Sequence, residues 1–71
     1  MRKIFGENVR NLRAARQVTQ TQVAEQCGIF RTYLSRIESG EANPSLTVIV
    51  ALAQALEVLP HELLYTRDSS Q

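Results

Sequence analysis

A ten-residue stretch, FRTYLSRIES at positions 30–39, gathers hydrogen-bond donors along one side of a predicted helix. When successive residues are stepped by about 100° around the helix axis, one arc collects Arg31, Thr32, Ser35, Arg36 and Ser39. The opposite arc, which is free to pack, collects Phe30, Tyr33, Leu34 and Ile37. An arginine presents a planar fork of donors that fits a phosphate or the O6 and N7 atoms of guanine, and a threonine methyl can meet a thymine methyl. The helix by itself leaves two interpretations open, a nucleic-acid surface and an ordinary solvated face.

Charge is divided unevenly along the chain. Residues 1–36 carry seven basic and two acidic side chains, a net charge of +5, whereas residues 37–71 carry one basic and five acidic side chains, a net charge of −4. A basic half joined to an acidic half indicates one face for a polyanion and another kept away from it. Chance asymmetry in a short chain is the alternative explanation.

Length and composition limit the fold. A chain of 71 residues makes one small domain, and 44% hydrophobic residues are enough for a single core. Only three glycines and two prolines occur, which permits long helical stretches and disfavours a β-protein with many turns. We therefore expect an all-α protein with one domain over residues 1–66 and a polar tail over 67–71.

The same composition argues against several functions. The single Cys27 forms no intrachain disulfide, which fits a reducing compartment, and with the single His61 it cannot build a metal cluster. No paired carboxylates, nucleophilic triad or phosphate-binding glycine loop is evident, so we expect neither an enzyme nor a cofactor. With no second domain expected to sense a ligand, we expect no small-molecule ligand either. The start, MRKIFGENVR, is charged too early for a signal peptide, and the apolar run Val48–Leu59 is too short to cross a bilayer. A cytoplasmic protein without a membrane partner is predicted.

Capping residues predict where five helices begin and end. Thr19 and Gln22 form a capping-box pattern, Gly28 permits a tight exit, and Ser45 and Pro60 suit helix starts. The expected helices cover residues 3–16, 20–27, 31–39, 46–56 and 60–64. The residues expected to face the core are Phe5, Val9 and Leu12 in the first helix, Val23, Ala24 and Cys27 in the second, and Leu46, Ile49, Val50, Ala53 and Leu56 in the fourth.

Residues 19–40, TQTQVAEQCGIFRTYLSRIESG, resemble the helix-turn-helix of the lambda-repressor and Cro-like family. Ala24 is small where two helices must cross closely, and Gly28 makes the turn between them. Leu34 and Ile37 lock the helix over residues 31–39 onto the helix over residues 20–27. The upstream NVRNLRAARQVTQ and the downstream ANPSLTVIVALAQALEVLPHELL are also similar to this family. The resemblance covers roughly residues 4–64 and implies a DNA-binding transcription regulator.

The resemblance also assigns roles to individual residues. It implies that the helix over residues 31–39 enters the major groove of double-stranded DNA. The base-contacting positions are Arg31, Thr32, Ser35 and Arg36, and the backbone-contacting candidates are Gln20, Tyr33, Asn43 and Arg10. Arg13 and Glu38 match an ion pair between the first and third helices, with two separate surface charges as the alternative.

A homodimer is expected because one recognition helix reads only a few base pairs, whereas two read a near-palindrome. Apolar residues near the C-terminus, namely Leu59, Pro60 and Leu64, together with Val48 form the expected interface. The RTYLS run and the short length look most like the controller proteins of restriction–modification systems. The competing interpretations are an antitoxin-like module that binds a protein partner, and a DNA-binding fragment of a longer chain.

Three positions depart from the family pattern. Phe30 stands where a capping Ser or Thr is commoner, so it packs inward or reaches a DNA methyl or sugar. Glu57 stands where glycine commonly ends the fourth helix, and Leu59 replaces a cap before the last helix.

Overall fold

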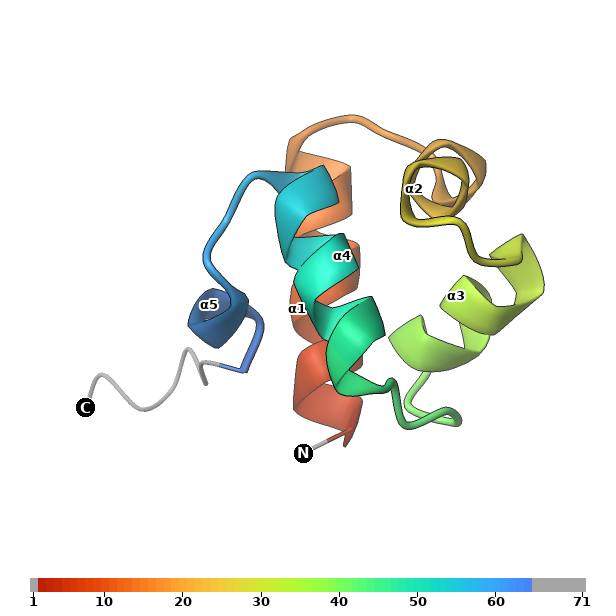
Figure 1. Cartoon of the computed structure of the whole chain (residues 1–71), viewed down its shortest axis with the longest axis vertical. Coiled ribbons are helices and arrows are strands. Elements are labelled where there is room, and N and C mark those ends of the chain that lie inside the picture. Colours follow the sequence, from red (N-terminus) through yellow and green to blue (C-terminus); the bar gives the residue numbers. More distant parts are fainter. Residues whose placement is uncertain (1, 65–71) are drawn as a thin grey trace.

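Residues 2–64, which the computed structural model describes, form five helices and no strand (Figure 1). The helices are α1 (Arg2–Ala15), α2 (Gln20–Cys27), α3 (Arg31–Glu38), α4 (Leu46–Leu56) and α5 (Pro60–Leu64). The all-α fold class and the order of the five helices are confirmed, and each boundary lies within one residue of its prediction. The predicted polar tail over residues 67–71 lies outside the described residues. None of the helices among the described residues has the length and apolar character needed to cross a membrane.

Local hydrogen bonds explain where the helices start and stop. The Thr19 hydroxyl accepts the backbone N–H of Gln22, whose side chain accepts the N–H of Thr19, so the predicted capping box is present. Gly28 ends α2 with φ 72°, in the left-handed region that glycine enters without a Cβ clash. Ser45 caps α4 through its hydroxyl. Glu57 ends α4 with φ 60°, a left-handed conformation that costs a non-glycine residue energy.

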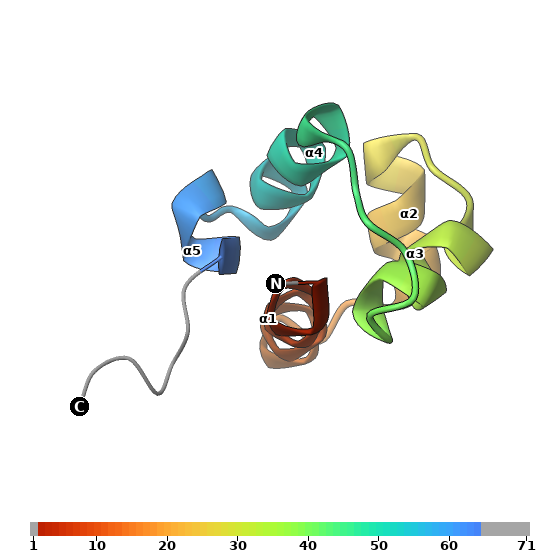
Figure 2. The same ribbon diagram turned by 90° about the horizontal axis from the view of Figure 1, so that it is seen from below.

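The α1 and α4 helices overlap in the centre of the molecule, with α2 and α3 on one side and α5 on the opposite side (Figure 1, Figure 2). The buried core draws on every helix. Its members are Phe5 and Val9 of α1, Val23 and Ala24 of α2, Leu34 and Ile37 of α3, Leu52, Ala53 and Leu56 of α4, and Leu63 of α5. Asn8 donates its side-chain amide to the backbone oxygen of Leu63 at 2.7 Å, which ties α5 to α1.

The predicted core face of α4 was partly wrong. Leu46 is 76% exposed and Val50 39% exposed, whereas Leu52, which the prediction omitted, is fully buried. The helix has the sequence LTVIVALAQAL and is apolar on nearly every side, so its periodicity does not choose a face. Packing against α2 and α5 makes the choice and turns Leu52, Ala53 and Leu56 inward.

Candidate nucleic-acid interface

The outer face of α3 is polar, basic and accessible. Arg31, Thr32 and Arg36 are exposed and Ser35 is half-buried, whereas Leu34 and Ile37 on the inner side have no exposed surface. Helical geometry therefore separates the two arcs of this helix as expected, with one exception. Phe30, which was assigned to the packing side, is 82% exposed. Since Phe30 is the N-cap with an extended backbone (φ −75°, ψ 145°), it lies before the first helical turn and does not share the buried stripe.

A buried ion pair fixes α3 to α1. Arg13 Nε donates to Glu38 Oε2 at 2.8 Å and Arg13 Nη2 donates to Glu38 Oε1 at 3.1 Å, which is the two-point geometry that favours arginine over lysine. The third nitrogen, Nη1, donates to the backbone oxygen of Val18 at 3.1 Å. Glu38 is only 4% exposed, so its carboxylate points into the protein rather than standing beside the outer face. The structure thus brings Arg13 and Glu38 together and removes a negative charge from the α3 surface.

Gln20 connects this ion pair to the start of α3. Its Nε2 donates to Glu38 Oε1 at 3.0 Å, and its Oε1 accepts a hydrogen bond from Arg31 Nη1 at 3.2 Å. Because the Glu38 carboxylate can only accept a hydrogen bond, it takes the NH₂ end of the Gln20 amide, and this leaves the amide oxygen toward the Arg31 guanidinium. A continuous chain of hydrogen bonds therefore runs from Arg13 in α1 to Arg31 on the outer face. Sequence reasoning gave Gln20 and Arg31 separate roles and missed their contact, which no spacing rule predicts.

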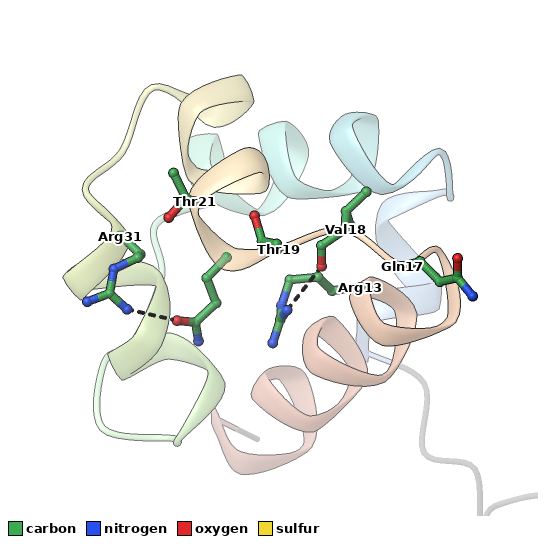
Figure 3. A pocket seen from close by; sticks show the side chains of 7 residues that line it. Arg13, Gln17, Val18, Thr19, Thr21 and Arg31 are labelled. Carbon is green, nitrogen blue, oxygen red and sulfur yellow. Dashed lines mark hydrogen bonds between the residues drawn. The ribbon is translucent and has the colours of Figure 1, made fainter.

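An open hollow of about 530 Å³ lies where this chain of hydrogen bonds reaches the surface (Figure 3). It is lined by Arg13, Gln17, Val18, Thr19, Gln20, Thr21 and Arg31. Arg31 and the amino end of α2 direct positive charge and partial positive charge toward it, whereas the charge of Arg13 is offset by Glu38; no acidic side chain lines the hollow. The hollow therefore suits an oxyanion such as a phosphate group.

Gly6, which sequence reasoning did not single out, allows α3 to approach α1 closely. A Cβ atom placed on Gly6 would clash with the backbone oxygen of Ile37 and would lie 2.7 Å from that of Glu38. The carboxyl end of α3 thus rests directly on the α1 backbone. Gly6 lies inside the predicted first helix, four residues before Arg10 on the same side of that helix. A glycine at such an interior position was the signal in the sequence that another segment packs closely there.

The remaining candidates for nucleic-acid contact are dispersed around α3. Arg10 is exposed on α1, on the same helical stripe as Gly6 and Arg13, and Asn43 is exposed in the loop after α3. Tyr33 is half-buried against the core. Arg36 lies 3.9 Å from Glu41, and both side chains are more than 60% exposed, so this pair is weak and leaves the guanidinium available.

The residues expected at a dimer interface differ in exposure. Leu59 is 59% exposed and Leu64 40% exposed, and Pro60 between them is also exposed. Val48 is half-buried and packs against the core, so less of its apolar surface is available to a partner. The three exposed residues belong to α5 and its start, on the side of the molecule opposite α2 and α3 (Figure 1, Figure 2).

Metal and redox chemistry find little support in residues 2–64. No group of three or more His, Cys, Asp or Glu side chains in this range could hold a metal ion. Burial raises the pKa of the Cys27 thiol, which disfavours the reactive thiolate. Cys27 packs against the core as a small apolar side chain would.

Comparison with known proteins gives consistent relatives. Residues 4–64 match the family model described as a helix-turn-helix domain. The chain is 39% identical over 70 residues to the HTH-type transcriptional regulator y4dJ of Sinorhizobium fredii, covering 99% of this chain and 91% of that protein. It is 40% identical over 65 residues to the control protein C.BamHI of Bacillus amyloliquefaciens, covering 90% and 80%. The crystal structure of the restriction-modification controller protein C.AhdI from Aeromonas hydrophila has a TM-score of 0.83 at 39% identity, covering 86% and 92%.

Proposed function

Because the chain belongs to the family of helix-turn-helix domains, we propose that it is a transcription regulator that binds near-palindromic double-stranded DNA as a homodimer. The observation that carries this proposal is the outer face of α3, where Arg31, Thr32 and Arg36 stand exposed on a helix that is anchored by a buried ion pair. An α-helix fits the major groove of B-DNA, and arginine forks there discriminate guanine from the other bases. Rigid attachment supports the readout because the donors are positioned before DNA arrives.

The hollow beside Gln20 and Arg31 supports a phosphate contact next to the groove. With α3 in the major groove, the amino end of α2 faces the flanking DNA backbone, where N–H groups and the helix dipole favour a phosphate. Gln20 keeps one amide hydrogen for this contact while its other donor bond goes to Glu38. Arg10 and Asn43 would add contacts to the backbone on either side.

The exposed apolar residues of α5 support the dimer. Leu59, Pro60 and Leu64 belong to α5 and its start. Since α5 lies on the side of the molecule away from α3, a second copy bound there would leave both recognition helices free (Figure 1). Two copies related by a two-fold axis would read half-sites about 10–10.5 bp apart. Sedimentation equilibrium of Leu59→Glu tests this surface, with Leu46→Glu, at an exposed leucine outside it, as the control. If Leu59→Glu sediments with the same molar mass as the wild-type dimer, this surface is not the dimer interface.

One similar protein is named a control protein, and one similar structure is that of a restriction-modification controller protein, and these names support a narrower biological setting. We propose that this chain is an autoregulating controller of such a system. With the chain immobilised, duplexes carrying the upstream region of its own gene should be enriched over unrelated genomic fragments of equal length. Enrichment of unrelated promoters instead would place it among general regulators.

Selection of bound duplexes from a random pool tests DNA recognition. The dissociation constant is then measured over a salt series on the selected duplex and on a shuffled duplex, and each neutralised phosphate contributes about −0.9 to the slope of log affinity against log salt. Arg31→Ala should cost about 1–3 kcal/mol on the selected duplex and far less on the shuffled one. Arg16→Ala, an exposed arginine already paired with Glu57, is the matched control. Equal losses for Arg31→Ala on both duplexes would reassign Arg31 to the backbone, and absence of any selected sequence would refute the function.

A further inference from the structure

The ring of Phe30 is 82% exposed in the folded chain. It provides no side-chain hydrogen bond at the N-cap of α3, although this position favours Ser, Thr, Asp or Asn. The apolar contact at this helix start comes from its neighbours instead, because Ile29 before the cap and Leu34 on the fourth helical position both pack in the core. Phe30 could therefore be replaced by serine with a gain in local hydrogen bonding.

Exposure alone carries no conclusion, because single exposed apolar side chains are common. The location of Phe30 is more informative. The other large apolar side chains exposed among residues 2–64 lie on α4 and on α5 and its start, namely Leu46, Val50, Leu59 and Leu64. The turn between α2 and α3 is at the edge of the molecule farthest from α5 (Figure 1, Figure 2). Phe30 is thus separated from the proposed dimer surface and adjoins the basic face that begins at Arg31.

We infer that Phe30 is a specificity-determining residue that contacts the C5-methyl group of a thymine in the major groove. This inference rests on the proposed function and deepens it. The amino-terminal residues of a recognition helix are those that reach base edges, and the thymine methyl is the one apolar group that the major groove presents. A phenyl ring at this position gains binding free energy by covering the methyl group, whereas it gains none over the polar edges of a G·C pair.

The adjacent arginine predicts where that thymine lies. Consecutive Cα atoms are about 3.8 Å apart, which is close to the rise of about 3.4 Å between stacked bases. The thymine that Phe30 contacts therefore lies within about two base pairs of the base that Arg31 contacts. Each half-site of a selected duplex should carry a thymine at that separation from the position whose discrimination is lost in Arg31→Ala.

The experiment is a double-mutant cycle that combines one substitution in the protein with one replacement in the DNA. The wild-type chain selects a duplex from a random pool, and each thymine of the half-site is then replaced in turn by deoxyuridine, which lacks only the methyl group. Dissociation constants are measured by fluorescence anisotropy for the wild type and for Phe30→Ser. At one thymine, deoxyuridine should weaken wild-type binding about fourfold, the equivalent of one buried methyl group. The same replacement should leave Phe30→Ser unchanged, while the other thymines affect both proteins equally.

Two further measurements separate a contact from a folding effect. Phe30→Ser should melt no lower than the wild type because serine supplies the missing cap, so a loss of affinity cannot come from unfolding. Leu46→Ser, which removes another exposed apolar side chain, should retain the full deoxyuridine effect.

Four outcomes would overturn the inference. If the half-site contains no thymine near the Arg31 position, or if Phe30→Ser shows the same deoxyuridine effect as the wild type, Phe30 does not read a methyl group while the proposed function stands. If Phe30→Ser instead changes the mass in sedimentation with the deoxyuridine effect intact, the ring belongs to a protein contact. A wild-type chain that selects no sequence would overturn the proposed function and this inference with it.

Discussion

Replacing Arg13 by alanine tests how strongly the buried ion pair holds α3 in place. The change removes two hydrogen bonds to Glu38 and one to the backbone oxygen of Val18. It leaves a carboxylate whose side chain is 3% exposed, with the Gln20 side-chain amide still donating to it at 3.0 Å. An uncompensated buried charge is expensive, because the ion has lost its water and no longer has its counterion.

The magnitude follows from this burial. Removing one partner of a buried pair costs about 3–5 kcal/mol. Arg13 is 18% exposed, and Gln20 still donates to Glu38, so we expect the lower end, about 3 kcal/mol. A domain of 71 residues has a total stability of about 4–10 kcal/mol. At about 4–8 °C per kcal/mol, the midpoint of thermal unfolding should fall by about 12–24 °C.

Urea titration followed by far-UV circular dichroism measures the free energy of unfolding of the wild type and of each variant. The control is Arg16→Ala, directly after the carboxyl end of α1, where the ion pair with Glu57 has side chains 39% and 70% exposed and contributes at most about 1 kcal/mol. Arg13→Ala should also bind the selected duplex more weakly at a temperature where it is folded, because the ion pair that holds Glu38 in place beneath Gln20 and Arg31 is lost. If both alanine variants lose equal stability, burial does not set the strength of the Arg13 pair and the reasoning is refuted.

Two other predictions concern backbone geometry. A Gly→Ala change would stabilise an ordinary helix interior, but Gly6→Ala should destabilise this protein by about 1–3 kcal/mol, because the new methyl group meets the backbone oxygens of Ile37 and Glu38. Urea titration measures this loss. A gain in stability would contradict the close packing of α3 on α1. Glu57→Gly should be more stable than Glu57→Ala by about 1 kcal/mol in thermal unfolding. Both variants lose the ion pair with Arg16, but only glycine adopts the left-handed φ of 60° without strain. An alanine variant of equal stability would show that this position carries no strain.

The family pattern and the local caps could be predicted from the sequence because each depends on few neighbouring residues. Thr19 and Gln22 are three positions apart, so their capping box is a local geometry that no tertiary contact needs to create. The polar arc of α3 is likewise a consequence of helical periodicity, and its exposure follows once Leu34 and Ile37 enter the core. The pairing of Arg13 with Glu38 was predicted through the family resemblance, since 25 residues separate the two along the chain.

Only the tertiary structure decided which contacts join distant segments. The apolar sequence of α4 permits several buried faces, and packing against α2 and α5 selected the face that contains Leu52. The role of Gly6 depends on the backbone of α3 lying against it, and the bridge through Gln20 depends on Glu38 and Arg31 arriving on either side of one amide. A sequence determines local conformation through short-range sterics and hydrogen bonds, whereas burial and bridging depend on distances between helices that are set only when the whole core packs.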